Sequence, residues 1–124
     1  MKTLLIITAT IESATGLLFL ISPNLTVSIL LGSSVEDPVG VLLGRVAGAA
    51  LLSLAIACWL LRNNAAASGV VKAMLLYNIT AGALLAYAGL GAQLSGLGLW
   101  PAVLIHVALA LWCIRCLWGK KLYR

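Results

Sequence analysis

Charged side chains are scarce in this chain: Asp, Glu, Lys and Arg make up only 9% of its 124 residues. Soluble proteins average about 25%, so the polar surface here is too small to cover a water-soluble core. The sequence also lacks a Ser–His–Asp spacing, a phosphate-binding loop, an H-E-x-x-H segment and paired carboxylates. We therefore predict no soluble catalytic domain, no catalytic residues, no metal site and no cofactor.

Acidic residues are the rarest of the charged types. The chain has three Asp and Glu residues against eight Lys and Arg residues, which gives a net charge of +5. A positive balance can indicate nucleic-acid binding, but that function needs a basic stripe interleaved with aromatic residues. The cations here lie instead at the ends of apolar segments. We therefore exclude nucleic acid as a partner and expect the lipid bilayer in its place.

Apolar residues are abundant, at 63% of the chain with a mean hydropathy of +1.13. Four segments, residues 3–22, 39–61, 69–90 and 99–118, reach the roughly 20 residues that a helix needs to cross a bilayer. Backbone polar groups in lipid must be satisfied within the segment, so each is predicted to be a helix. The short connections favour antiparallel neighbours. The predicted fold is an all-α, integral membrane, antiparallel four-helix bundle that forms a single domain over residues 1–124.

The connection between the first two spans carries its own helix signals. Ser22 before Pro23 is typical of a helix start, with Ser as the cap and Pro at the first helical position. The apolar run that follows ends at Gly32 and is too short to span, so residues 23–32 are predicted to form an interfacial helix. Asp37 before Pro38 repeats the start signal and opens the second span.

Positive charge falls on one side of the four-pass arrangement. The opposite side has only Glu36 and Asp37 outside the spans. Because positively charged loops stay on the cytoplasmic side, we predict that both termini are cytoplasmic. The cations on this side are Lys2, Arg62, Lys72, Arg115, Lys120, Lys121 and Arg124.

Each span carries one strongly polar side chain, and these are Glu12, Arg45, Asn78 and His106. A charged side chain at the centre of a bilayer costs about 2.5–3.5 kcal/mol even on a lenient scale, so such residues face each other or a wet cavity. Their depths, at about 1.5 Å per residue, allow all four to share one layer of the bundle. We predict that they form an intramembrane polar cluster.

Two interpretations of this cluster stay open. In the first, it lines a ligand pocket in which Glu12 and His106 exchange protons and Arg45 holds an anionic or carbonyl group. In the second, Glu12 and Arg45 form an internal ion pair, and Asn78 and His106 are hydrogen-bonding links between helices.

Small residues at regular spacing mark the second span. Gly40, Gly44 and Gly48 form a G-x-x-x-G-x-x-x-G series, a spacing that lets two helix backbones approach closely. The series is predicted to pack against a neighbouring helix of the same bundle, or alternatively against another subunit.

A C-x-x-C pair lies near the end of the last span. Cys113 and Cys116 have the spacing of redox and metal-binding motifs. The predicted orientation places them at the reducing cytoplasmic side, and cysteine is also a common small apolar filler. A thiol pair therefore remains an alternative to simple packing.

The order of these features resembles small four-helix membrane proteins of the DoxX-like families. The similarity is carried by Gly16-Leu17-Leu18-Phe19-Leu20, Pro23, Leu30-Leu31-Gly32, residues 43–52 and Trp59. The resemblance implies a four-helix bundle in a bacterial inner membrane, and some such proteins are described as accessory to redox or stress complexes. It also implies a recurring place in the pattern for Arg45.

The small loops favour a non-enzymatic role. We expect an accessory or assembly subunit that associates with itself or with a larger membrane complex. Two alternatives remain from the residues themselves. One is a polar-cored bundle that binds or transports a small ligand such as a quinone, a lipid or a proton-coupled solute. The other is a membrane thiol oxidoreductase.

Overall fold

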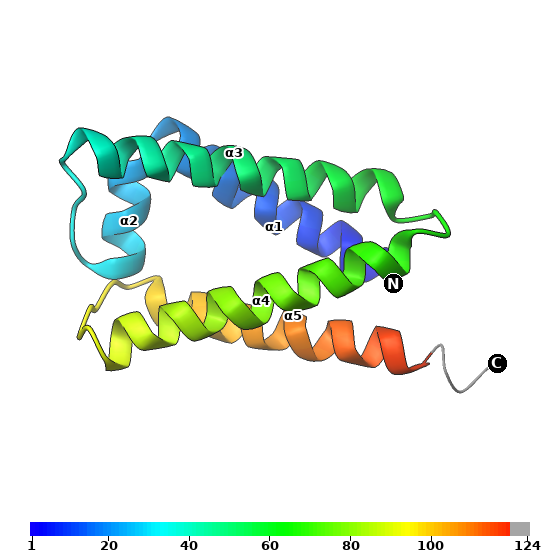
Figure 1. Ribbon diagram of the computed structural model, residues 1–124. Coiled ribbons are helices and arrows are strands. Elements are labelled where there is room, and N and C mark those ends of the chain that lie inside the picture. The colour runs from blue at the N-terminus through cyan, green and yellow to red at the C-terminus, as the bar shows by residue number, and fades with distance from the viewer. Residues whose placement is uncertain (120–124) are drawn as a thin grey trace.

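The computed structural model describes residues 1–119 and contains only helices in that part of the chain (Figure 1). Four of them, α1, α3, α4 and α5, are long and apolar enough to cross a membrane, and α2 lies between the first two. The all-α prediction is confirmed, and each span ends within two residues of its predicted boundary. The helices are α1 (Lys2–Ile21), α2 (Pro23–Leu31), α3 (Pro38–Leu61), α4 (Ala67–Leu90) and α5 (Leu99–Gly119).

Local signals explain the helix starts. The Asp37 side chain accepts a hydrogen bond of 2.7 Å from the Gly40 backbone amide, so it caps α3 as predicted. The Ser22 side chain makes no capping bond at the start of α2. Its carbonyl accepts instead from the Thr26 hydroxyl at 2.9 Å. The α2 helix ends at Gly32, whose left-handed φ of 72° is a conformation that glycine adopts without strain.

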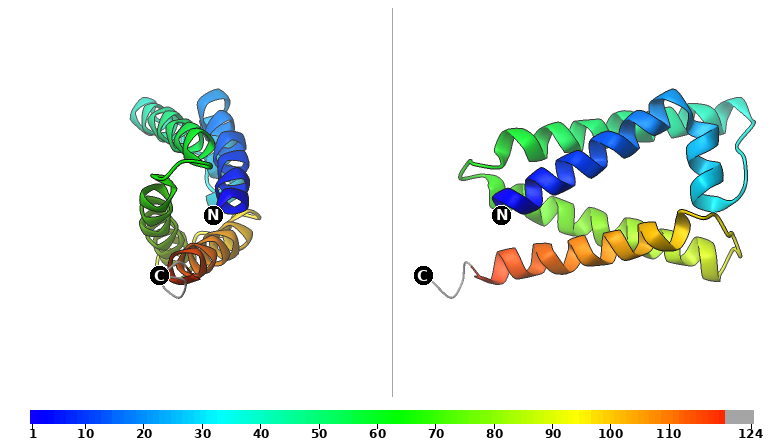
Figure 2. Two further views of the ribbon diagram at one scale, coloured as in Figure 1. Left: turned by 90° about the vertical axis from the view of Figure 1, so that its right-hand side faces the viewer. Right: turned by 180° about the vertical axis from the view of Figure 1, so that it is seen from behind.

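The four long helices form two antiparallel pairs. The α1 helix packs along α3, and α4 packs along α5, whereas contacts between the pairs are sparse (Figures 1 and 2). The two pairs meet at the end of the molecule that holds the start of α1 and the α3–α4 loop. At the other end α2 runs across the gap and contacts α1, α3 and α5.

Glycines allow the close approach of α1 and α3. A Cβ atom added at Gly48 would lie 2.7 Å from the Gly16 carbonyl oxygen, and one added at Gly44 would lie 2.8 Å from the Pro23 side chain. A Cβ atom at Gly40 would meet Val35 and Asp37 of the preceding loop instead. The part of the series that packs against a neighbouring helix is therefore Gly44 and Gly48, and Gly16 completes the contact.

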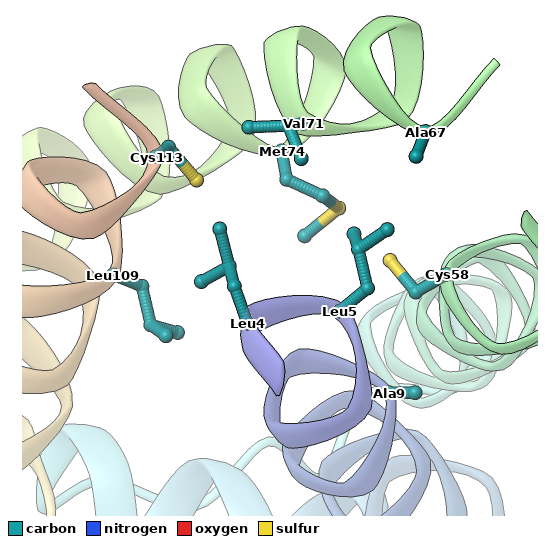
Figure 3. Close-up of a cluster of buried hydrophobic side chains, with 9 residues drawn as sticks. All are labelled: Leu4, Leu5, Ala9, Cys58, Ala67, Val71, Met74, Leu109 and Cys113. Atoms are coloured by element: carbon teal, nitrogen blue, oxygen red, sulfur yellow. The ribbon is translucent and has the colours of Figure 1, made fainter. Parts of the chain in front are cut away.

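A tight apolar cluster holds the two pairs together near the start of α1 (Figure 3). Leu4 and Leu5 of α1 point between the other three long helices and are at most 1% exposed. We call this group the inner core cluster; it consists of Leu4, Leu5, Ala9, Cys58, Ala67, Val71, Met74, Leu109 and Cys113.

The charges divide between the two ends. Lys2 begins α1, Arg62 follows α3, Lys72 is near the start of α4 and Arg115 is near the end of α5, all toward the end with the inner core cluster. Glu36 and Asp37 lie in the loop between α2 and α3, at the other end. The remaining predicted cations, Lys120, Lys121 and Arg124, fall outside the described residues. The cytoplasmic placement of the termini stays a prediction.

Candidate functional site

A cavity of about 640 Å³ separates the two helix pairs, and all five helices contribute to its wall. It lies between the inner core cluster and α2. Its lining is mostly aliphatic, with polar groups from three helices. The lining residues are Ile11, Glu12, Thr15, Phe19, Leu30, Ala47, Ala50, Leu51, Leu54, Tyr77, Ala81, Leu84, Leu85, Ala102, Ile105, His106 and Leu109.

Glu12 is the most deeply buried ionisable residue among those that line the cavity. Its side chain is 2% exposed, and one carboxyl oxygen, Oε2, accepts a hydrogen bond of 3.4 Å from the Tyr77 hydroxyl. The α1 helix places it in the cavity wall together with Ile11 and Thr15. This weak hydrogen bond leaves capacity on the carboxyl group for a further partner.

Asn78 and His106 form a hydrogen-bonded pair across α4 and α5. The Asn78 amide nitrogen donates to the Met74 carbonyl at 2.7 Å, which directs Oδ1 toward His106. His106 Nδ1 lies 2.9 Å from that oxygen. Because an amide oxygen only accepts, Nδ1 must carry the proton, and in the neutral ring Nε2 keeps its lone pair. His106 therefore brings a hydrogen-bond acceptor to the cavity.

Tyr77 belongs to the site, although the sequence analysis did not include it. Its ring packs edge-on against His106, with centroids 5.6 Å apart and an interplanar angle of 77°. Through its hydroxyl it also joins Glu12 to this pair. The sequence feature that could have identified Tyr77 is its position next to Asn78 in the middle of a span, away from the interfacial belts where tyrosine is enriched.

Arg45 lies apart from the other three residues of the predicted cluster. Its side chain is exposed, and the cavity-lining residues of α3 lie on the opposite side of the helix. At about 100° per residue, Ala47, Ala50 and Leu54 are roughly 140–200° around the helix from Arg45. The structure thus brings Glu12 and His106 to one cavity wall, with Asn78 buried behind His106 as its hydrogen-bond partner, and Arg45 supplies no positive charge to the cavity.

Thr8 lies one turn from Glu12, toward the inner core cluster. It is fully buried, and its hydroxyl has no hydrogen-bond partner among residues 1–119. Buried polar groups are nearly always paired, so this hydroxyl is a local exception next to the site.

The cysteines lie away from the cavity. Cys58 and Cys113 are fully buried in the inner core cluster, and Cys116 is half-buried one turn beyond it. All three are free thiols. Within the described part of the chain, His, Cys, Asp and Glu side chains form no group of three that could hold a metal ion.

Comparison of the chain with known protein families, curated proteins and solved structures found no match. The resemblance to DoxX-like proteins therefore stays a prediction.

Proposed function

We propose that this membrane protein binds a small, mostly apolar molecule whose polar head sits between Glu12 and His106. The observation that carries the proposal is a carboxyl side chain that is buried in the wall of an apolar cavity and forms no salt bridge within residues 1–119. Such a group inside a membrane is costly and marks a functional site unless a partner compensates for it. A ligand that hydrogen-bonds to Glu12 supplies that compensation.

The cavity suits a ligand of this kind in size and lining. Its volume of about 640 Å³ lies within the range of about 300–1,000 Å³ that small-molecule pockets occupy. Aliphatic side chains such as Leu51, Leu54 and Leu85 surround the polar corner. An alkyl chain or ring system can therefore fill the cavity while one head group reaches Glu12.

The polar corner favours a head that donates a hydrogen bond. His106 Nε2 accepts, and the Glu12 carboxyl can accept in either protonation state. A hydroxyl group that donates to one of them satisfies the corner, while the Tyr77 hydroxyl keeps its hydrogen bond to Glu12. Phenols, quinols and lipid alcohols have this chemistry.

An alkylphenol tests the proposal in the purified protein reconstituted in lipid nanodiscs. The probe is 4-nonylphenol with one ring fluorine, followed by fluorine NMR, and its methyl ether is the matched control ligand. We expect saturable binding of the phenol and about tenfold weaker binding of the ether, because an acceptor left without its donor costs about 1–3 kcal/mol. Equal binding of the two ligands would contradict the proposed head-group contacts.

Two variants locate the contact. Glu12→Leu removes the acceptor and should weaken binding of the phenol, whereas Glu36→Leu makes the same change on an exposed loop and should not. His106→Asn keeps a donor near the position of Nδ1 but removes Nε2, so it should also weaken binding. Circular dichroism must show a retained helical fold. Unfolding of both site variants would favour a purely structural role for the cluster.

An accessory role in a larger membrane complex is the second candidate. Arg45 favours it, because this residue of a membrane-spanning helix is exposed outside the bundle. A partner carboxylate or a lipid phosphate would neutralise its charge. Native mass spectrometry of membrane extracts should then show a protein partner that is lost in Arg45→Gln and kept in Lys72→Gln, a control on the exposed side of α4. Loss of bound phospholipid without loss of any protein would assign Arg45 to the lipid instead.

A further inference from the structure

Both ends of the cavity are closed. At one end the inner core cluster fills the space between the helix pairs, and Leu5, Val71 and Cys113 have no exposed surface. At the other end α2 covers the opening with Leu30 in the cavity wall. A ligand therefore reaches the polar corner from the side, between helices.

The α2 cap is held by its backbone. The Gly98 amide donates to the Ile29 carbonyl at 2.8 Å, and the Ser95 amide donates to the Leu31 carbonyl at 3.2 Å. The backbone of Leu30 lies so close to Gly96 that a Cβ atom at that glycine would collide with it. These contacts join the end of α2 to the loop before α5, which makes this end an unfavourable entrance.

The side between α3 and α4 has small residues where the cavity wall reaches the outer surface of the bundle. We define the α3–α4 seam as Ala47, Ala50, Ala81 and Leu84, which line the cavity from these two helices. Three of the four are alanines, and the Leu84 side chain is 64% exposed. The side between α1 and α5 carries the larger residues Ile11, Phe19 and Ile105.

We propose that the ligand enters and leaves through the α3–α4 seam directly from the bilayer, and is therefore a membrane-dissolved molecule with an uncharged head. This inference rests on the proposed function, because it describes the access route to the same site. Every residue of the seam is apolar, so a charged head would cross it without compensation. A neutral hydroxyl loses far less hydration on the same path.

The exchange rate of the fluorinated alkylphenol in nanodiscs tests the route. Ala50→Trp places a bulky side chain in the seam, and Ala49→Trp is its matched control on the adjacent exposed position outside the cavity wall. We expect Ala50→Trp to slow entry and exit about tenfold, which corresponds to a barrier higher by about 1.4 kcal/mol. Ala49→Trp should leave both rates unchanged.

A second seam variant covers the case in which Ala50→Trp fills the cavity and removes binding. Leu84→Trp enlarges an exposed seam residue on the opposite helix and should slow exchange while the affinity is kept. Ile105→Trp applies the same bulk to the α1–α5 side and should not slow exchange. Slowing by Ile105→Trp alone would overturn the proposed route.

A disulfide bond between α2 and the loop before α5 tests whether the ligand enters at this end of the bundle. Leu31→Cys and Ser95→Cys place the disulfide between two residues that a backbone hydrogen bond already links. The background variant is Cys116→Ser, because the other two native cysteines are fully buried. Exchange should be unaffected by this bond. If the disulfide stops exchange while the seam variants do not, entry occurs under α2 and the inference fails. The absence of any binding to the unmodified protein would instead refute the proposed function.

Discussion

The contact between Gly16 and Gly48 predicts a sharp difference between two Gly→Ala substitutions. In Gly48→Ala the new methyl group would lie 2.7 Å from the Gly16 carbonyl oxygen, 2.9 Å from the Leu20 amide nitrogen and 3.0 Å from the Phe19 Cβ atom. Two of these atoms belong to the backbone and cannot rotate away. Ordinary contact begins at 3.4 Å, so α1 and α3 must separate by about 0.7 Å.

Separation of this kind is an overpacking effect, which typically costs about 1–3 kcal/mol. Gly69→Ala is the matched control, because a Cβ atom at Gly69 meets nothing within 4 Å. That variant should be neutral or more stable by up to about 1 kcal/mol, since alanine is a better helix former than glycine. The free energy of unfolding is measured by circular dichroism during titration of mixed micelles with a denaturing detergent. Equal stability of Gly48→Ala and the unmodified chain would refute the assignment of this glycine to the α1–α3 contact.

Three further substitutions and one matched control test the buried residues near the site and in the inner core cluster, in the same unfolding assay. Thr8→Val keeps the shape of the side chain and removes a buried hydroxyl that has no hydrogen-bond partner among residues 1–119, so it should stabilise the protein by about 1 kcal/mol. A loss of stability would reveal a hydrogen-bond partner for that hydroxyl. Asn78→Leu leaves His106 Nδ1 without its acceptor and should cost about 1–3 kcal/mol, together with weaker phenol binding; unchanged binding would show that the ring orientation is set by other contacts. Cys113→Ser puts a hydroxyl into the inner core cluster and should destabilise by about 1–3 kcal/mol, whereas Cys116→Ser should be close to neutral; the opposite order would indicate that Cys116 has a role beyond packing.

The boundaries of the helices were predictable because their signals are local. The Asp37-Pro38 start depends on one side chain and one backbone amide three residues later, and the structure has that bond. The end of α2 follows from Gly32, the position that adopts a positive φ. The length of each apolar run then determined the spans. None of these features depends on how the helices rotate against one another.

Which residues line the cavity depends on how each helix is rotated about its own axis, and the pattern of apolar residues defines this rotation poorly. The cost of a charged side chain in lipid predicts that Arg45 faces the inside of the bundle, and this was the basis for its place in the predicted cluster. The observed α3 turns the face with Gly44 and Gly48 toward α1 and α2 instead. A backbone approach of this kind is possible only at glycines, whereas an arginine near a helix end can extend its long side chain toward the membrane surface.

The rotation of α3 also explains why Glu12 has no counter-charge from that helix, the source of the predicted partner Arg45. With Gly48 against Gly16, the α3 residues that face the cavity carry no polar side chain; they are Ala47, Ala50, Leu51 and Leu54. The same packing that brings α1 and α3 together therefore separates Arg45 from Glu12, which were the two partners of the ion pair in the second interpretation of the cluster. The carboxyl group is left with the Tyr77 hydroxyl as its hydrogen-bond partner among residues 1–119, in a cavity large enough for a ligand. Helix packing and the availability of Glu12 for a ligand are thus two consequences of the same glycine contact, and variants that widen this contact should alter both stability and ligand binding.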